Sequence, residues 1–140
     1  MTQPITGGCL CGAIRYSVSE PVQNIIACHC VNCRKATGSG ASHNAILPMS
    51  AVTFTQGKTK VFTDTADNGS QLYRHFCGDC GSPIMSQRAA MPERTVLKAG
   101  TLDAPEQLKI TMDVWTRSAM PWMHIDPASD QHTHNRPIKT

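Results

Sequence analysis

Hydrophobic and polar residues alternate along much of the chain, in short segments that glycine and proline separate. In residues 12–20 (GAIRYSVSE), Ile14, Tyr16 and Val18 fall on one face of an extended chain, with Arg15 and serines on the other. Such alternation is typical of a β-strand with one buried face. Further strands are predicted, from recurring β-branched and aromatic residues, at 40–48, 52–55, 59–64, 70–77 and 94–100. A turn at 56–58 would join the second and third of these.

Helical segments are few and short. Residues 31–38 are expected to form one helical turn that ends at Gly38, and residues 103–108 a second. The tail from Asp126 is polar and poorly patterned, so residues 126–140 are expected to form an irregular C-terminal arm. The pattern therefore predicts a mainly β fold: a small antiparallel-sheet domain with short helical turns.

Length and charge narrow the class of protein. The 140 residues suit a single domain, 1–140, with a real hydrophobic core. The net charge is +3, the basic residues are dispersed and aromatic residues make up 5% of the chain, which disfavours a nucleic-acid surface. The N-terminus lacks the charged and apolar regions of a signal peptide, and no apolar run is long enough for a membrane span. We therefore expect a cytoplasmic protein with no membrane or nucleic-acid partner.

Seven cysteines dominate the candidate chemistry, and they occur in three tight clusters: Cys9 and Cys11; Cys28, Cys30 and Cys33; Cys77 and Cys80. Disulfide pairing would leave one cysteine over, and a reducing compartment would keep all of them as thiols. Cysteines two or three residues apart are well placed to share a metal ion. The spacing therefore predicts zinc ligation.

The seven cysteines divide into one set of four and one set of three. Cys9 and Cys11 would share a face of an extended segment, and Cys77 and Cys80 have the spacing of a zinc knuckle. Neither pair alone holds zinc well, whereas the two together form a closed site of four cysteines. The third cluster already supplies three ligands, so its fourth position would belong to water or substrate.

A histidine is the alternative fourth ligand of the three-cysteine cluster. His29 lies within the cluster, and His43 and His75 are near enough in sequence to fold back. His29 would face away if the segment is extended. His132 and His134, in the polar tail, are weaker candidates.

Four segments carry a resemblance to a known family: GGCLCGAIRY, ACHCVNCRKATGS, FCGDCGSPI and LKAGTLD. In order and spacing they resemble the glutathione-dependent formaldehyde-activating enzyme and centromere-protein-V family, over about residues 5–125. The resemblance implies a β-tent fold with two zinc ions per chain. It assigns a structural zinc to Cys9, Cys11, Cys77 and Cys80, and a catalytic zinc to Cys28, Cys30 and Cys33.

The same resemblance implies a carbon–sulfur lyase that condenses glutathione with formaldehyde to S-hydroxymethylglutathione. Its partners would be a small-molecule thiol and an aldehyde. A zinc ion with three thiolates carries net charge −1, which suits a soft fourth ligand such as a thiol. The residues are thus compatible with a substrate thiolate that adds to an aldehyde carbon to give a hemithioacetal.

Several polar residues beside the three-cysteine cluster have two interpretations. Arg34 and Lys35 would offset its negative charge or hold a glutathione carboxylate, or they would form a solvated helix face. Thr37 and Ser39 would donate hydrogen bonds to substrate or cap a turn. His29 would relay a proton or support the ligands.

Two other functions compete with the enzyme. Zinc knuckles commonly present surfaces to nucleic acid or protein, which would make the chain a binding module. A two-zinc adaptor would have both sites closed and no exchangeable ligand.

Overall fold

The computed structural model describes residues 4–66 and 68–135, and it confirms the mainly β fold: 44% of residues are in strands and 12% in helices. A small antiparallel sheet contains three strands in the order β1-β2-β5, with bounds β1 (Ile5–Gly8), β2 (Arg15–Val18) and β5 (Val52–Gln56). An eight-stranded sheet has the order β11-β10-β3-β4-β9-β8-β7-β6.

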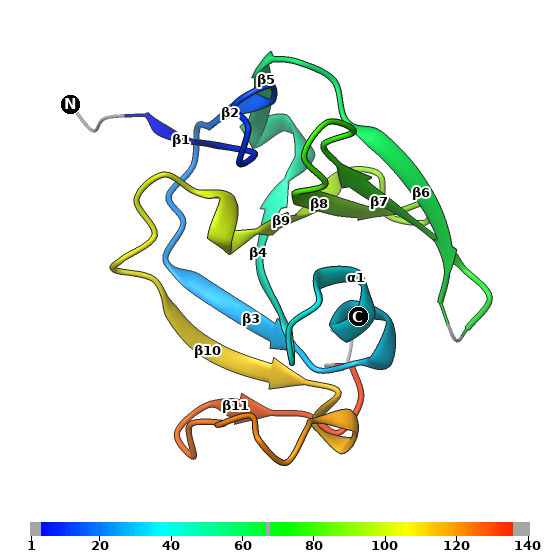
Figure 1. The fold of residues 1–140 in the computed structure, drawn as a ribbon. Helices are drawn as coiled ribbons and strands as arrows, with labels where there is room; N and C mark the ends of the chain where they lie inside the picture. Colours follow the sequence, from blue (N-terminus) through cyan, green and yellow to red (C-terminus); the bar gives the residue numbers. More distant parts are fainter. Residues whose placement is uncertain (1–3, 67, 136–140) are drawn as a thin grey trace.

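The strands of the large sheet are β3 (Asn24–Cys28), β4 (Ser42–Pro48), β6 (Lys60–Thr65), β7 (Gln71–Phe76), β8 (Pro83–Arg88), β9 (Arg94–Lys98), β10 (Lys109–Val114) and β11 (Asp130–Gln131). Most neighbours pair antiparallel, but β10 runs parallel to both β3 and β11. The helix α1 spans Val31–Thr37, and short 3-10 helices lie at Met49–Ala51, Ala99–Thr101 and Thr116–Ser118. Figure 1 shows the large sheet curving around α1.

The hydrophobic core lies where the two sheets face each other. Ile14, Tyr16 and Val18 of the alternating segment are 1%, 1% and 2% exposed, so the predicted buried face of this strand is confirmed. They pack in one cluster with Ile84 and Leu97 of the large sheet. The Tyr16 hydroxyl lies 2.7 Å from Thr101 Oγ1, which satisfies the one polar group of this ring. The core thus holds β2 against β8 and β9.

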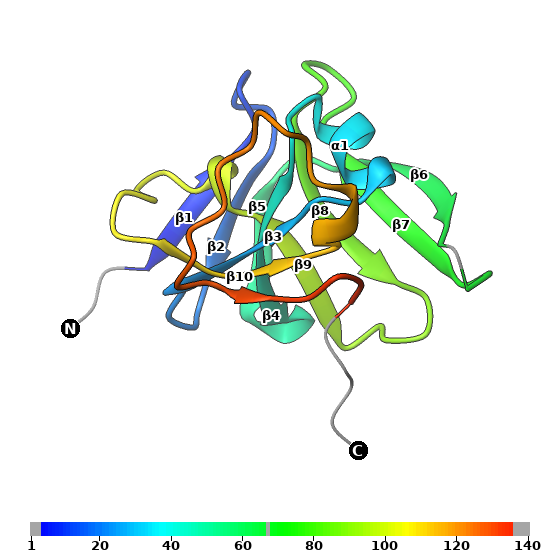
Figure 2. The same ribbon diagram turned by 90° about the horizontal axis from the view of Figure 1, so that it is seen from below.

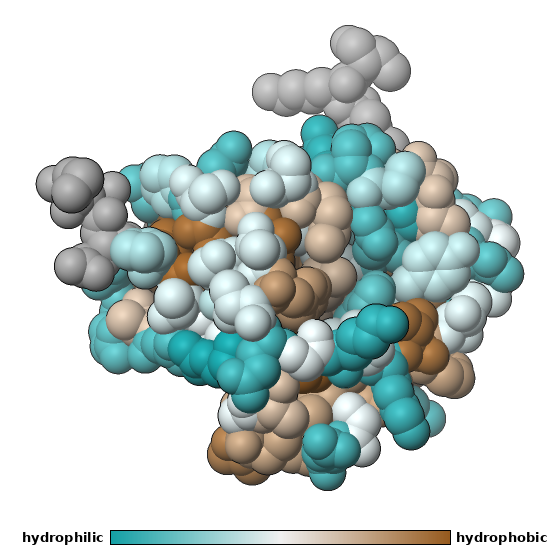
Figure 3. Space-filling view, turned by 90° about the horizontal axis from the view of Figure 1, so that it is seen from above, coloured by the Kyte–Doolittle hydropathy of each residue, from teal (hydrophilic) through white to brown (hydrophobic). Residues whose placement is uncertain are grey.

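Exposed apolar side chains are dispersed. The large ones are Leu10, Val31, Ile46, Val61, Phe62, Ile110 and Trp122. On the face shown in Figure 3, brown areas alternate with teal and white ones. In the part of the chain that the structure describes, no helix is long and apolar enough to cross a lipid bilayer.

The predicted strands at 12–20, 40–48, 52–55, 59–64, 70–77 and 94–100 correspond to β2, β4, β5, β6, β7 and β9. The turn at 56–58 does not make a hairpin, because β5 joins the small sheet and β6 forms an edge of the large one. Residues 31–38 form the predicted helix, which ends at Gly38 in a left-handed conformation (φ 70°).

The predicted helical turn at 103–108 is present only as a hydrogen-bonded turn, in which Leu108 N donates to Pro105 O at 3.1 Å, and no helix forms there. Asp103 N donates to Thr6 O at 2.9 Å, and the Asp103 carboxylate accepts hydrogen bonds from Thr6 and Arg15. These contacts hold the segment against β1 and β2, and a 3-10 helix precedes it instead. Pro105 also disfavours a helical conformation in the residue before it.

The C-terminal arm is more regular than expected. Asp130 and Gln131 form β11, which pairs with Met112 and Asp113 of β10. Trp115 N also donates to His134 O at 3.0 Å. Figure 2 shows this orange and red segment running beside β10. Residues 136–140 of the predicted arm lie outside the described residues.

Candidate metal centres

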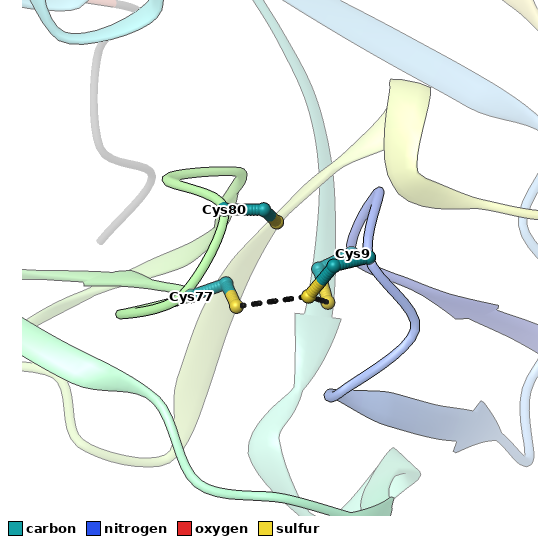
Figure 4. Close-up of side chains that lie close together, drawn as sticks. Cys9, Cys77 and Cys80 are labelled. Carbon is teal, nitrogen blue, oxygen red and sulfur yellow. Dashed lines mark hydrogen bonds between the residues drawn. The ribbon is translucent and has the colours of Figure 1, made fainter.

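Four cysteine sulfurs meet where the two sheets approach each other. Cys9 and Cys11 lie on the turn between β1 and β2, and Cys77 and Cys80 on the turn between β7 and β8. All four Sγ atoms lie within 4.8 Å of one another. Cys11 Sγ is 3.6 Å from Cys9 Sγ and 3.8 Å from Cys77 Sγ. Figure 4 shows side chains from both turns pointing into one space. We call this group the four-cysteine cluster.

Backbone turns, rather than an extended chain, bring these four sulfurs together. The expected extended geometry at Cys9–Cys11 is wrong: Gly12 N donates to Cys9 O at 3.2 Å, and Gly12 adopts φ 82°. Ile14 N then donates to Cys9 Sγ at 3.2 Å. The second turn also ends in a glycine with φ 82°, and Gly81 N donates to Cys77 O at 2.9 Å. N–H groups directed at sulfur favour the thiolate form that binds metal.

The four-cysteine cluster fits zinc. Tetrahedral zinc with Zn–S bonds near 2.3 Å places its sulfurs about 3.8 Å apart, close to the two observed separations. Every cysteine of the chain is a free thiol, so each sulfur is available as a ligand. Hydrogen bonding from the Ser82 hydroxyl and backbone lowers the pKa of Cys80 to about 5, which favours its ionisation at neutral pH.

The other three cysteines surround the start of α1. Cys28 is the last residue of β3, Cys30 is the N-cap of α1, and Cys33 lies in its first turn. Their sulfurs lie within 4.8 Å of one another, and we call them the three-cysteine cluster. Cys33 N donates to Cys30 Sγ at 3.2 Å, so a helix cap fixes this sulfur.

Crowding makes the three thiols titrate very differently. The hydrogen bond with Cys30, and next that with Cys33, raises the pKa of Cys28. Hydrogen bonds from Cys28 and Cys30 lower the pKa of Cys33 to about 2, with smaller contributions from Lys98 and Arg74. One sulfur therefore ionises readily, whereas three thiolates so close together need a cation among them. The donor set thus fits a zinc ion with three protein ligands.

No histidine of the described chain joins the three-cysteine cluster. His29 is 1% exposed, and its Nε2 donates to Asp113 Oδ1 at 2.7 Å. His43 pairs with Ala27 and so lies on the sheet face opposite Cys28. His75 Nδ1 lies 2.8 Å from Thr59 Oγ1 and is not part of the cluster.

The His29–Asp113 pair extends to the C-terminal arm. Asp113 lies on β10 and is 3% exposed, and its Oδ2 accepts a hydrogen bond from Ser129 Oγ at 2.5 Å. A chain of hydrogen bonds therefore connects the arm to the residue between Cys28 and Cys30. Sequence reasoning singled out His29 but missed both partners, because neither has a motif of its own.

The remaining candidate residues lie at the C-terminal end of α1. Thr37 Oγ1 donates to Cys33 O at 2.9 Å and accepts from Ser39 N at 3.2 Å, so these two residues cap the end of α1. Lys35 is exposed and Arg34 half-buried, both in the last turn of α1. A basic residue there complements the helix dipole.

Sequence reasoning also missed a buried lysine in this region. Lys98 ends β9 with 8% of its surface exposed, and its Nζ donates to Ser42 Oγ and Asn44 Oδ1, each at 2.9 Å. Burial lowers the pKa of its ammonium group. The one sequence signal was its place in LKAGTLD, which says nothing of partners on another strand.

Two comparisons with known proteins complete the description. A family model described as glutathione-dependent formaldehyde-activating enzyme matches residues 4–118. A crystal structure of a Rhodobacter sphaeroides protein is similar, with a TM-score of 0.56 and 23% sequence identity. The match covers 71% of this chain and 88% of that chain, and at this identity it supports the fold alone. Residues 119–140, including the whole C-terminal arm, lie outside the family match.

Proposed function

Because the chain belongs to the glutathione-dependent formaldehyde-activating enzyme family, we propose that it condenses a thiol with an aldehyde to a hemithioacetal. Glutathione and formaldehyde are the substrates that the family description suggests, and the enzyme would then be a carbon–sulfur lyase of the S-hydroxymethylglutathione synthase type. The observation that carries the proposal is the three-cysteine cluster, whose sulfurs lie within 4.8 Å of one another without a fourth protein ligand in the described chain.

In this proposal the two clusters have different roles. The three-cysteine cluster (Cys28, Cys30, Cys33) would hold a catalytic zinc ion, and the four-cysteine cluster (Cys9, Cys11, Cys77, Cys80) a structural one. Zinc bound by three thiolates accepts a thiol as its fourth ligand and lowers the pKa of that thiol. Support for the division comes from the number of sulfurs in each cluster, since closed zinc sites take four ligands and catalytic sites three.

The chain's own residues would prepare the site for an anionic substrate. The N-terminal end of α1 fixes Cys30 and Cys33, and the end of β3 fixes Cys28. Positive charge from Lys98 and Arg74 favours ionised sulfur there. Arg74 is itself held by Asp64, whose Oδ2 lies 2.9 Å from Arg74 Nε.

Zinc content and thiol binding test the proposal together. Protein purified without chelator should contain about two zinc ions per chain, one for each cluster. It should bind glutathione in a calorimeter and accelerate the exchange between free and hydroxymethylated glutathione in NMR spectra. Cys30→Ser should lose one zinc ion, the glutathione binding and the acceleration while remaining folded.

The same experiment separates the enzyme from its alternative. Two tightly held zinc ions with no thiol binding and no acceleration would refute the proposal and favour a two-zinc adaptor or binding module. Binding of glutathione without acceleration by any aldehyde tested would refute the condensation reaction.

A further inference from the structure

The buried Lys98 has an ammonium hydrogen that the proposed chemistry does not use. Lys98 lies opposite Asn44 in the register of β9 and β4, and Ser42 lies opposite Cys28 in the register of β4 and β3. Residues directly opposite each other, and residues two apart on one strand, share a sheet face. Lys98, Asn44, Ser42 and Cys28 therefore line one face of the large sheet.

Lys98 has only neutral partners. Its ammonium donates to Ser42 Oγ and Asn44 Oδ1, and among the described residues no carboxylate lies within ion-pair distance of it. A charged group that is 8% exposed is costly unless an opposite charge compensates it. The groups that favour its protonated form are the sulfurs of Cys33, Cys28 and Cys30, so its charge acts toward the three-cysteine cluster.

The hydrogen-bond network leaves one ammonium proton free. Ser42 Oγ donates its only hydrogen to Asn44 Oδ1 at 2.6 Å, so both Ser42 and Asn44 act as acceptors toward Lys98. Two of the three ammonium hydrogens are used in these contacts. The third hydrogen remains for a further acceptor. A neutral amine would keep both existing contacts, so this third proton is the one that can leave without breaking the network.

We propose that Lys98 is a catalytic residue that binds the aldehyde oxygen and protonates it as the thiol adds. This inference rests on the proposed function. As the substrate thiolate forms its S–C bond to the carbonyl carbon, the C=O π bond breaks and its electron pair goes to oxygen. The third Lys98 proton moves to that oxygen, which yields the hemithioacetal hydroxyl and a neutral amine that water then reprotonates.

A purely electrostatic role is the competing explanation, and it predicts a different defect. If Lys98 only offsets the charge of the thiolates, its removal weakens zinc binding but leaves the turnover per bound zinc unchanged. If Lys98 donates to the developing alkoxide, its removal lowers turnover at full zinc occupancy. Loss of a single such donor typically costs about 10²–10³-fold in kcat.

The test compares wild type with Lys98→Met, with Lys98→Arg as the conservative variant and Lys109→Met as a matched control. Lys109 is an exposed lysine on β10. Zinc per chain, calorimetric glutathione affinity, and kcat and KM for glutathione with formaldehyde are measured for each protein. Lys98→Met should lose about 100-fold or more in kcat per bound zinc, whatever the change in its zinc content. Lys98→Arg should recover part of this loss, and Lys109→Met should match wild type.

The kinetic results distinguish a catalytic Lys98 from a purely electrostatic one. A kcat per bound zinc in Lys98→Met equal to that of wild type overturns the catalytic role, as does a loss that falling zinc content explains entirely. If Lys98→Met does not fold, Lys98→Gln replaces it, because its amide can donate two hydrogen bonds but carries no ionisable proton. A zinc-loaded wild type without catalysis is a separate outcome, because it overturns the proposed function itself.

Discussion

Replacing Cys77 by serine removes one of the four sulfurs that connect the turn between β1 and β2 to the turn between β7 and β8. Cys77 is 2% exposed, and its Sγ lies 3.8 Å from Cys11 Sγ. The two turns belong to different sheets, so these sulfurs connect the small sheet to the large one. We expect Cys77→Ser to be insoluble or unfolded.

The magnitude follows from the ligand set. A structural zinc ion contributes an apparent ~10–16 kcal/mol to folding, whereas a whole domain is typically stable by about 5–15 kcal/mol. The free energy lost with the ion of the four-cysteine cluster is therefore comparable to the entire stability of the domain. The three-cysteine cluster, in contrast, spans only the junction of β3 and α1. Cys30→Ser removes a sulfur of equal chemistry there and should leave the fold intact.

The assay compares these two matched variants. Far-UV circular dichroism and thermal unfolding report the fold, and atomic absorption reports zinc per chain. Cys30→Ser should keep a cooperative transition and about one zinc ion, while Cys77→Ser should show no cooperative transition. If both variants fold equally well and retain one ion each, the division into a structural and a catalytic cluster is wrong.

Three further predictions concern residues outside the clusters. Leu97→Ala removes a side chain that is 0% exposed and should lower the free energy of unfolding in urea by about 2–5 kcal/mol; a cost below about 1 kcal/mol would contradict the packed core. Asp113→Ala leaves His29 buried without its partner and should cost about 1–3 kcal/mol in the same measurement, whereas an unchanged midpoint would show the pair to be neutral. The pKa of Asp103 is lowered to about 2 by hydrogen bonds from Arg15 and then Thr6. The ionised Asp103 therefore contributes fully to the free energy of unfolding above the pKa of an aspartate in the unfolded chain, near 3.9, and this contribution is lost as pH falls toward 2. The stability difference between wild type and Asp103→Asn should shrink over that range. A difference independent of pH would exclude the pairing.

Strands with one buried face were the predictable part of the fold. Ile14, Tyr16 and Val18 alternate with partly exposed residues, and β2 appears where that pattern predicts it. β1, β3, β8, β10 and β11 were not predicted, although β10 (KITMDV) does alternate polar and apolar residues. Three consecutive residues of β8, at 84–86, are buried, so no period of two is visible in that strand. Sequence pattern reports burial on one face, and it fails where both faces are covered.

The candidate site, like the fold, could be predicted only in part. The three-cysteine cluster lies within one short segment, so residue spacing was sufficient to predict it. The cluster of four was predicted from the number of ligands that zinc requires, although its turns were not. Lys98 could not be predicted, since Ser42 and Asn44 belong to another strand and only the register of β4 with β9 brings them together.

The difference in chain span between the two clusters has a consequence for protein synthesis. Residues 28–33 leave the ribosome together, so their three sulfurs are available to an ion before most of the chain exists. The four-cysteine cluster has to wait for Cys80, and it must also close the loop from Cys11 to Cys77, a separation of 66 residues. We therefore expect the ion of the open site to be captured first and the ion that completes the fold to arrive last. When zinc is scarce, the three-cysteine cluster would then be occupied while the four-cysteine cluster, on which the fold depends, is still empty.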